Sequence, residues 1–277
     1  QLGGRHAVGT YHARAFPGGL RFNAQRDRLG DLLGAVDRKF THAILLFGVV
    51  RIDECAVDYP GSWQLNVAAM RRAIDDLVAQ RIVPVLISSD YVFDGSHGNW
   101  RESDRVNPNT AYGRQKAEAE AYLSAQSGRW LIIRLSKIVD AAPGNHNPLG
   151  EWVGRIKTGA PVRCAADQVF CPTHIDDAAA LILQLAASGA TGIWHVAGKA
   201  FSRLQLLETL VAAIRAVAPQ TSAAIEPCRL HDLPFRERRP LDTSLATEKL
   251  RARFAFDEIA MEALCRQLAI THFAGGG

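Results

Sequence analysis

Three side chains, Ser89, Tyr112 and Lys116, have the types and the spacing that proton transfer to a carbonyl group requires. A Tyr and a Lys four residues apart lie on one face of a helix, so the ammonium can sit beside the phenol. A free phenol ionises near pH ~10, and a fixed positive charge close by lowers that pKa toward the working pH. The Ser89 hydroxyl can hold a substrate carbonyl between itself and the phenol. The trio therefore indicates reduction of a ketone or oxidation of an alcohol, in which a cofactor moves the hydride.

The elements around this trio place it at the edge of a sheet. Residues 83–87 (V-P-V-L-I) form an apolar run that predicts a buried strand, and Ser88 and Ser89 follow it directly. Ligand sites in open α/β sheets lie beyond the carboxyl ends of the strands, where this order puts Ser89. Tyr112 then opens a helical stretch that runs to residue 123. The alternative is a strand–loop–helix unit with a surface Tyr and Lys, and the catalytic interpretation is favoured.

Apolar runs alternate with helical stretches along most of the chain. Residues 66–79 carry the one-sided apolar stripe of an amphipathic helix, for which Asn66 is the expected N-terminal cap. Residues 176–187 are a second expected helix, with acidic residues at its positive end. This alternation predicts a doubly wound α/β fold, in which helices cover both faces of a parallel sheet. The expected strands cover residues 7–11, 43–47, 83–87, 130–134 and 193–196.

The pattern changes after Gly198, where helices replace the alternation. Helices are expected at residues 202–217 and 257–270, with connections rich in Pro and Arg, and near residues 151–157. The sequence thus predicts two domains with a substrate cleft between them. The predicted dinucleotide-binding domain covers residues 1–141 and about 169–200, and a smaller, mostly helical substrate domain covers residues 142–168 and 201–277.

Composition excludes several other classes of protein. The 277 residues carry a net charge of +4 without a basic arm or stripe, so no nucleic-acid partner is expected. The five cysteines are scattered and no metal-ligand spacing occurs, which predicts reduced thiols and no metal site. No apolar run approaches the ~18 residues that a membrane span needs, and the start lacks the apolar segment of a signal peptide. We therefore expect a cytoplasmic protein without a membrane partner.

Four motifs occur in the order in which one known family has them. Chance is a poor explanation for this order. Together the motifs make the chain resemble the extended short-chain dehydrogenase/reductases, and within them the dTDP-4-dehydrorhamnose reductase branch. The motifs are S-S-D-Y-V-F-D-G (88–95), E-S-D-R-V-N-P-N-T-A-Y-G-R-Q-K (102–116), A-D-Q-V-F-C-P-T (166–173) and R-R-P-L-D-T-S-L-A-T-E-K-L (238–250).

The resemblance implies a role for each member of the trio. Tyr112 would donate a proton to the carbonyl oxygen, and Ser89, where the family commonly has Thr, would hydrogen-bond the same oxygen. Lys116 would lower the pKa of Tyr112 and bind the nicotinamide ribose hydroxyls. The expected cofactor is NADPH, with NADH as the alternative, and the expected substrate is a 4-keto sugar linked to a nucleotide. Donors aimed at an oxygen that gains negative charge lower the barrier of such a reaction.

The start of the expected nucleotide fold is not complete. Such a fold opens with a strand and a glycine-rich turn whose amides meet the pyrophosphate. Gly3 could be only the tail of that turn, or part of a disordered terminus, so the first βα unit is expected to be incomplete. Arg14 follows the second strand and favours the 2′-phosphate of NADP over a role as a solvated arginine. The expected cofactor contacts are Gly3, Arg14, Phe47, Gly48, Asn66, Ser88, Tyr112, Lys116 and Leu135.

The expected substrate contacts depart from the family at some positions. Val50 stands where the rhamnose enzymes have a Thr, and Ser136-Lys137 replaces their Ser-Trp, so the sugar is left open. Arg239 suits a diphosphate because guanidinium matches its geometry, and a structural ion pair is the equal alternative. The predicted substrate-binding residues are Val50, Asp90, Phe93, Asp167, Gln168 and Arg239. His174 and His195 are expected to pack or to hydrogen-bond, and Trp100 and Trp152 to form walls or core.

A function from another class remains open beside the reductase. The regulatory β subunit of methionine adenosyltransferase belongs to the same branch, and the incomplete nucleotide motif would suit a non-catalytic NADP-binding scaffold. The complete trio favours the enzyme, because a scaffold has no physical need for it. A homodimer is compatible with the sequence, and the expected small-molecule partner is a nucleotide sugar or a related biosynthetic keto compound.

Overall fold

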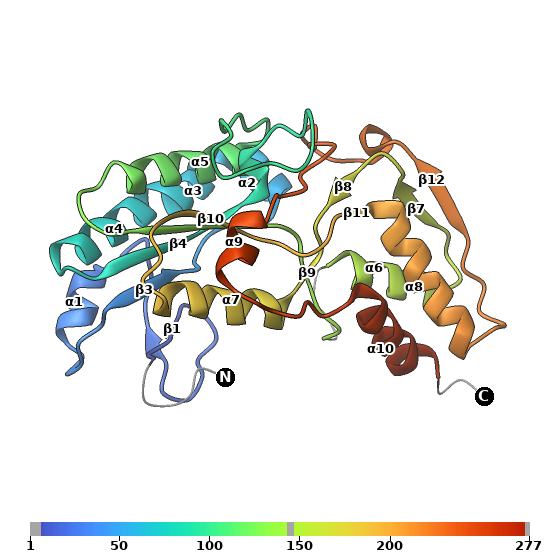
Figure 1. The fold of residues 1–277 in the computed structure, drawn as a ribbon, viewed down its shortest axis with the longest axis horizontal. Coiled ribbons are helices and arrows are strands. Elements are labelled where there is room, and N and C mark those ends of the chain that lie inside the picture. Colours follow the sequence, from blue (N-terminus) through green and yellow to red (C-terminus); the bar gives the residue numbers. More distant parts are fainter. Residues whose placement is uncertain (1–6, 143–146, 275–277) are drawn as a thin grey trace.

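A parallel sheet of four strands forms the centre of the protein (Figure 1). The computed structural model describes residues 7–142 and 147–274. The strand order is β10-β5-β4-β3, and each strand runs parallel to its neighbours. These strands are Gly192–Val196 (β10), Leu131–Leu135 (β5), Val83–Ser89 (β4) and His42–Leu45 (β3). Each lies within two residues of the bounds expected from its apolar run, and β3 ends at Leu45, two residues before Phe47.

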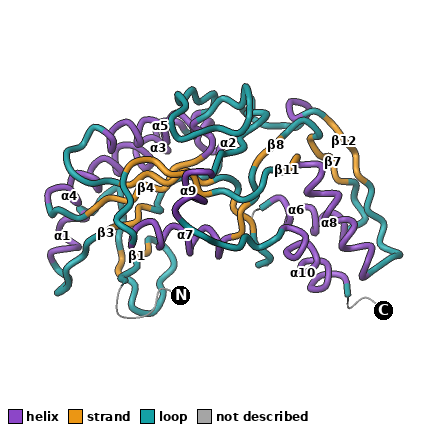
Figure 2. The backbone as a smooth tube through the Cα atoms, in the orientation of Figure 1, coloured by secondary structure: helices purple, strands orange, loops and turns teal. Residues whose placement is uncertain are grey.

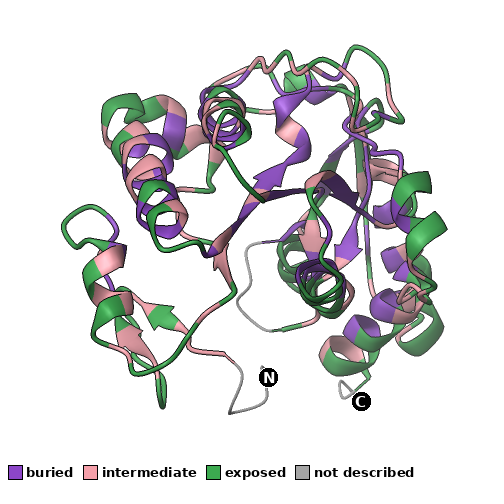
Figure 3. Cartoon of the chain, turned by 60° about the vertical axis from the view of Figure 1, so that its left-hand side comes forward, coloured by how far each residue is buried: buried purple, intermediate pink, exposed green. Residues whose placement is uncertain are grey.

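Helices cover both faces of this sheet because successive strand residues point to opposite sides. Val85, Leu131 and Ile133 pack against helix α7 (Ile175–Ala187) on one face. Leu86 and Ile132 pack on the other face against α4 (Met70–Ala79) and α5 (Ala111–Ser124). Figure 3 shows the central strands largely buried. The predicted doubly wound α/β fold is confirmed.

The helix around Asn66 differs from the expectation. A π-helix, Gln64–Ala69, leads without a break into α4, and Asn66 lies buried inside this helical run. The prediction that Asn66 caps the helix is wrong. Its side-chain amide instead forms hydrogen bonds with Val49 and Gln115, which are remote in the sequence.

The first strand also differs. Of the expected strand at 7–11, Thr10–Tyr11 (β1) forms a strand, and it joins Leu20–Arg21 (β2) in a separate parallel pair rather than in the central sheet. Helix α1 (Leu29–Gly34) follows and packs near α4, where Arg28 forms an ion pair with Asp76.

A second hydrophobic core lies beside the sheet, among helices α6 (Pro148–Lys157), α8 (Arg203–Val217) and α10 (Met261–Phe273). Figure 2 shows these three helices together at one end of the molecule. The expected helix at 257–270 begins later, at Met261, and α8 begins one residue later than expected, with Ser202 as its cap. The division into two domains stays a prediction. Short strands complete this end: β6 (Ile138–Val139) with β9 (Thr173–His174), β7 (Val162–Ala165) with β12 (Ile225–Cys228), and β8 (Val169–Phe170) with β11 (Phe201–Ser202).

Residues 233–247, here called the return segment, bring the chain back from β12 to the central sheet. The Trp100 amide donates to the Ser244 carbonyl at 2.9 Å, and the Thr243 amide donates to the Val169 carbonyl at 3.0 Å. The segment leads into α9 (Glu248–Arg253), which packs against β10. The remaining helical elements are α2 (Ile52–Val57), α3 (Tyr59–Trp63), and the 3-10 turns Asp90–Val92 (η2) and Leu230–Asp232 (η3).

Candidate active site

The fold brings the predicted trio together at the carboxyl end of β4. Ser89 is the last residue of β4, and Tyr112 lies in the first turn of α5, one turn before Lys116. The Ser89 hydroxyl is near enough to the Tyr112 phenol to affect its pKa, while it donates its proton to Asp90. The Lys116 Nζ lies 5.8 Å from the centre of the Tyr112 ring and donates to the Ile87 carbonyl at 2.9 Å. All three side chains are more than nine-tenths buried.

A helix cap and a close backbone contact fix the start of α5. Thr110 caps the helix, with its hydroxyl accepting from the Gly113 amide at 3.1 Å. A Cβ on Gly113 would lie 2.2 Å from the Tyr91 carbonyl oxygen, so only glycine lets the helix pack this closely against η2. The close approach sets Tyr91 and Tyr112 edge to face, with ring centres 6.2 Å apart.

Glu237 is a residue that sequence reasoning missed. Both of its carboxylate oxygens accept from the Ala111 amide, at 3.0 and 2.9 Å, at the positive end of α5. Its carboxylate also lies 3.4 Å from Arg114. The return segment therefore caps the helix that carries Tyr112. No local pattern marks this contact, since the two partners are 126 residues apart.

Burial decides the ionisation of the phenol. Burial raises the pKa of Tyr112, and the charge of Asp90 raises it further, while the nearby Ser89 hydroxyl acts in the opposite direction. The net shift in the protein on its own is upward, so the lowering expected from Lys116 stays a prediction. Burial also lowers the pKa of Lys116 to about 8, although Glu120 opposes this shift. Tyr112 is thus held in the protonated form, which is the form that can donate.

Asp90 binds the protein rather than solvent. The Ser89 hydroxyl donates to its Oδ1 at 2.9 Å, and the Ser136 hydroxyl donates to its Oδ2 at 3.0 Å. Burial raises the pKa of Asp90, and hydrogen bonds from Thr243, Ser89 and Ser136 oppose that shift. Because the single Ser89 proton lies on Asp90, Ser89 must turn before it can donate to a carbonyl oxygen. With only 3% of its surface exposed, Asp90 does not face a substrate in this structure.

The segment after β3 is held by Asn66. The Asn66 side chain accepts from the Val49 amide at 2.7 Å and donates to the Val49 carbonyl at 2.9 Å and to Gln115 at 2.7 Å. Gly48 has a φ of +153°, and a Cβ there would lie 2.8 Å from Asn66 Oδ1. Asn66 therefore positions the Gly48-Val49 backbone instead of offering its amide to a ligand.

The other predicted cofactor contacts differ in accessibility. Ser88 is buried, and its hydroxyl has no hydrogen-bond partner among the described residues, which leaves a polar atom at the sheet edge for a ligand. Leu135 is the register partner of Ser89, and Phe47 packs against Phe22 with ring centres 6.3 Å apart. Arg14 is exposed in the loop after β1. Gly3 lies outside the described residues.

The predicted substrate residues are spread over several environments. Val50 is 62% exposed, whereas Phe93 is fully buried and stacks on Trp100 with ring centres 4.5 Å apart. The prediction for Phe93 is corrected, because a ring enclosed by the core has no face for a ligand. Asp167 accepts from the Leu230 amide at 2.7 Å.

The remaining predicted substrate residues, Gln168 and Arg239, each contact another side chain of the protein. Gln168 accepts from Arg203 at 3.3 Å. Arg239 forms an ion pair with Asp53 at 2.8 Å, yet its second terminal nitrogen is buried without a partner in the part of the chain that the structure describes. The structural ion pair that is the alternative role for Arg239 is thus present, and one donor is left over.

Both histidines behave as the sequence predicted. His195 is fully buried, with Nδ1 3.2 Å from the Ala246 carbonyl and Nε2 3.4 Å from Arg134. The His174 ring accepts from the Asp176 amide at 3.2 Å and so caps α7. Among the described residues no group of His, Cys, Asp and Glu side chains could hold a metal ion. None of the helices in residues 7–142 and 147–274 is long and apolar enough to cross a membrane.

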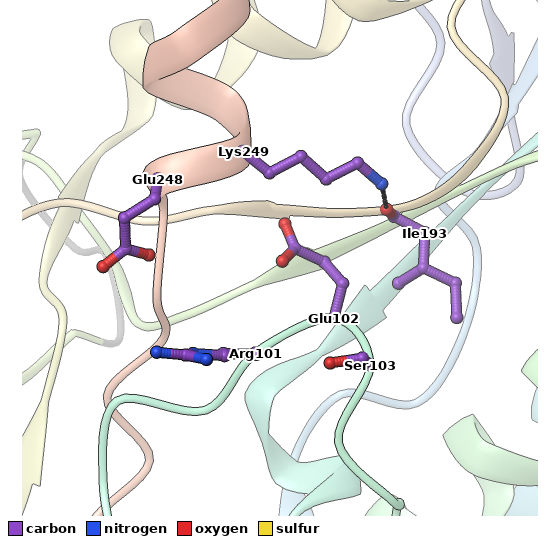
Figure 4. A pocket seen from close by; sticks show the side chains of 6 residues that line it. All are labelled: Arg101, Glu102, Ser103, Ile193, Glu248 and Lys249. Carbon is purple, nitrogen blue, oxygen red and sulfur yellow. Dashed lines mark hydrogen bonds between the residues drawn. The ribbon is translucent and has the colours of Figure 1, made fainter.

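An open cavity of about 610 Å³ lies away from the trio, at the edge of the sheet. It is lined by residues of the 101–103 loop, β10 and α9, with Lys249 donating to the Ile193 carbonyl at 2.6 Å. Figure 4 shows the Glu102 and Lys249 side chains close to each other in this cavity, with Arg101 and Glu248 on one side. None of the trio residues lines it. The cavity is therefore distinct from the candidate active site.

Comparison with known proteins identifies the family. The model of the RmlD substrate binding domain matches residues 50–269, which is most of the chain. The dTDP-4-dehydrorhamnose reductase of Sinorhizobium fredii is 26% identical over 212 residues, which cover 72% of this chain and 71% of that protein. The dTDP-4-dehydrorhamnose reductase of Aggregatibacter actinomycetemcomitans is 27% identical over 155 residues. In that second case the match spans 53% of this chain and about half (52%) of the relative's length.

A solved structure agrees with the sequence relatives. The hypothetical dTDP-4-dehydrorhamnose reductase from Sulfolobus tokodaii superposes with a TM-score of 0.82 and 25% identity, over 95% of this chain and 92% of that one. The resemblance predicted from the four motifs is confirmed. The fold, the trio and the family match lead to one conclusion: the chain belongs to the RmlD substrate binding domain family.

Proposed function

We propose that this chain is a reductase that uses NADPH, or NADH less well, to reduce a keto group on a nucleotide-activated deoxysugar. One observation carries the proposal: Ser89, Tyr112 and Lys116 converge at the carboxyl end of a central parallel strand. That edge is where α/β folds bind their ligands. The relatives named dTDP-4-dehydrorhamnose reductase support the substrate class.

The residues divide the work of the reaction. The bound cofactor supplies the hydride to the carbonyl carbon. Tyr112 donates its phenolic proton to the carbonyl oxygen as negative charge develops there. Lys116 stabilises the phenolate that remains, since opposite charges attract strongly at a buried site. Ser89 turns from Asp90 toward the same oxygen and adds a second hydrogen bond.

The residues at the sheet edge fit a dinucleotide. The unpartnered Ser88 hydroxyl offers a hydrogen bond, and Gly48 lets a ligand approach the backbone closely. Lys116 can exchange the Ile87 carbonyl for ribose hydroxyls without moving far, because its ammonium has three donors. Arg14, exposed after β1, is the residue that would favour the 2′-phosphate of NADP.

The proposal is tested by binding and then by turnover. Calorimetry on the full chain should detect NADPH, and NADH more weakly. Turnover of a dTDP-4-keto-6-deoxysugar, followed by loss of NADPH absorbance, should fall by about a hundredfold or more in Tyr112→Phe. Cofactor binding should survive in this variant, because the ring and the helix remain.

Each other outcome has a defined meaning. A chain that binds neither cofactor at millimolar concentration is not a reductase. Unchanged turnover in Tyr112→Phe would remove Tyr112 from the mechanism. A chain that binds cofactor but turns over no keto sugar would act as a non-catalytic NADP-binding subunit, the alternative kept open above.

A further inference from the structure

The return segment is tied to α2 on both sides of Glu237. Asp53 on α2 accepts from the Arg236 amide at 3.0 Å and forms the ion pair with Arg239 at 2.8 Å. Glu237 lies between these two arginines in the sequence and accepts from the Ala111 amide of α5. The contacts with Asp53 therefore anchor the backbone that presents the Glu237 carboxylate to α5.

Glu237 acts on the first turn of the helix that carries the phenol. A helix leaves its first N–H groups without partners inside the helix, and its positive end favours a carboxylate. Glu237 satisfies the N–H group of Ala111. The Thr110 hydroxyl satisfies that of Gly113. Tyr112 lies between these two residues, so the two contacts together fix its backbone.

The ring of Tyr112 depends on this backbone for its direction. It packs edge to face on Tyr91 and belongs to an apolar cluster with Cys55. Hydrophobic packing is non-directional, so it keeps the ring buried without fixing where the hydroxyl points. The Ser89 hydroxyl gives its proton to Asp90. The placement of the phenol is therefore set largely by the first turn of α5.

We propose that Glu237 is a positioning residue for Tyr112: by holding Ala111 it sets the direction from which the phenol donates its proton. This inference rests on the proposed function and adds a residue to its site. The side chain of Glu237 is 19% exposed and lies 3.4 Å from Arg114, which restricts the carboxylate to the helix start. A misplacement of about 1 Å can cost a reacting group about a hundredfold in rate.

The test follows turnover of a dTDP-4-keto-6-deoxysugar with NADPH in variants of the full chain. Glu237→Ala should lower kcat about tenfold or more and change KM by less than about threefold. Glu237→Gln keeps an oxygen that accepts from Ala111, so it should recover most of the lost kcat. Urea unfolding at the assay pH gives the folded fraction by which each kcat is corrected.

A double variant shows whether Glu237 acts through the phenol. In the Tyr112→Phe background, Glu237→Ala should change the residual turnover by less than about twofold, because the group that it positions is already gone. A loss in that background as large as the loss in the wild type would overturn the proposal.

Glu258 provides a matched control away from the trio. It also accepts from a backbone amide, that of Lys199 at 3.1 Å, and forms an ion pair with Arg251. Its side chain is 24% exposed, close to the 19% of Glu237. Glu258→Ala should therefore lower the urea midpoint about as much as Glu237→Ala does, but leave kcat unchanged.

The remaining outcomes separate this inference from the proposed function. An unchanged kcat in Glu237→Ala, or an equal loss in Glu258→Ala, would overturn the role of Glu237 and leave the reductase in place. Failure of Glu237→Gln to recover turnover would also overturn it, because the hydrogen bond to Ala111 would then not be what matters. A wild type that reduces no keto sugar would overturn both proposals.

Discussion

At the scale of single residues, the trio is held by groups whose charges are costly to bury. Lys116 keeps an ammonium in the interior with one carbonyl as its partner, and Asp90 keeps a carboxylate there on three hydroxyl groups. Such groups are retained in proteins where function needs them, at a cost in stability. The two residues therefore allow stability and activity to be separated by substitution.

Lys116→Met should stabilise the protein at neutral pH. The folded pKa of Lys116, about 8, lies below the ordinary 10.5, so the folded state binds fewer protons than the unfolded state between these values. The penalty is complete below pH 8 and disappears as the pH rises toward 10.5. Burial of the ammonium costs roughly 3 kcal/mol, and loss of the Ile87 hydrogen bond offsets about 1 kcal/mol.

Urea unfolding at pH 7 and at pH 10.5 measures this effect. The variant should be more stable by about 2 kcal/mol at pH 7, and this advantage should be gone at pH 10.5. Lys157→Met, at an exposed position, serves as the control. A difference between Lys116→Met and wild type that stays constant with pH would contradict the burial argument.

Asp90→Asn should raise stability at pH 8 and lower activity. Because the folded pKa of Asp90 is raised above 3.8, the folded state binds more protons than the unfolded one between these two values, and stability falls as the pH rises across that range. The amide removes this cost but no longer holds the Ser89 proton with a charge. We expect kcat to fall about tenfold or more with little change in KM.

The same variant has a second measurable consequence. Asp90 is one of the charges that raise the pKa of Tyr112, so the basic limb of the pH–rate profile should move to lower pH in Asp90→Asn. Ser136→Ala is the matched variant, since it removes one hydrogen bond to Asp90 and keeps the charge. An unchanged profile and an unchanged kcat in Asp90→Asn would show that Asp90 does not position Ser89.

At the scale of elements, α5 is joined to the sheet by a buried ion pair. Arg134 on β5 contacts Glu120 on α5 through three hydrogen bonds of 2.7 to 3.2 Å, and both side chains are at most 6% exposed. Glu120→Ala should therefore destabilise the protein by about 3–5 kcal/mol, because it leaves an unpaired buried guanidinium. Urea unfolding at pH 7 measures the change.

An exposed ion pair provides the comparison. Arg51 and Glu54 lie 3.0 Å apart with side chains more than half exposed, so Glu54→Ala should cost less than about 1 kcal/mol. Similar losses in the two variants would mean that the Arg134–Glu120 pair is no more stabilising than a surface pair.

Elements defined by their own apolar pattern were predictable from the sequence, and those defined by remote contacts were not. The runs that became β4, β5 and β10, and the helices α7 and α8, carry their burial pattern and caps locally. Asn66 has the residue type of a helix cap, but Val49 and Gln115 draw its amide into a buried network. The stacking of Phe93 on Trp100 likewise depends on a loop that folds back.

The candidate site shows the same limit. The trio was predictable because its spacing follows helix geometry and a strand end. Its electrostatics were not, because burial exceeds the effect of a lysine that lies 5.8 Å away and is turned to a carbonyl. The return segment supplies both Glu237, which caps α5, and Thr243, whose hydroxyl acts on the pKa of Asp90. No local sequence pattern connects this segment to the site.

At the scale of the whole molecule, the return segment and the sheet meet at His195. Its ring lies between the Ala246 carbonyl and Arg134, and its amide donates to Glu102 at 3.2 Å. Burial lowers the pKa of His195 to about 3, and the charge of Arg134 adds to the shift. Protonation of this ring would place two cations side by side in the interior. The contacts of His195 with Glu102, Arg134 and Ala246 therefore depend on a neutral ring.

His195→Gln should make the protein less sensitive to acid. Since the folded pKa is depressed, the stabilising contribution is complete above about pH 6.5 and is lost as the pH falls toward 3, by about 1.4 kcal/mol per pH unit. Glutamine keeps a donor for Ala246 and an acceptor for Arg134 but does not titrate. The free energy of unfolding, measured from pH 7 to pH 4, should therefore fall less steeply in the variant than in wild type, by the equivalent of one proton. His12→Gln, in the exposed loop after β1, should keep the wild-type slope, and equal slopes in wild type and His195→Gln would show that acid opens the molecule elsewhere.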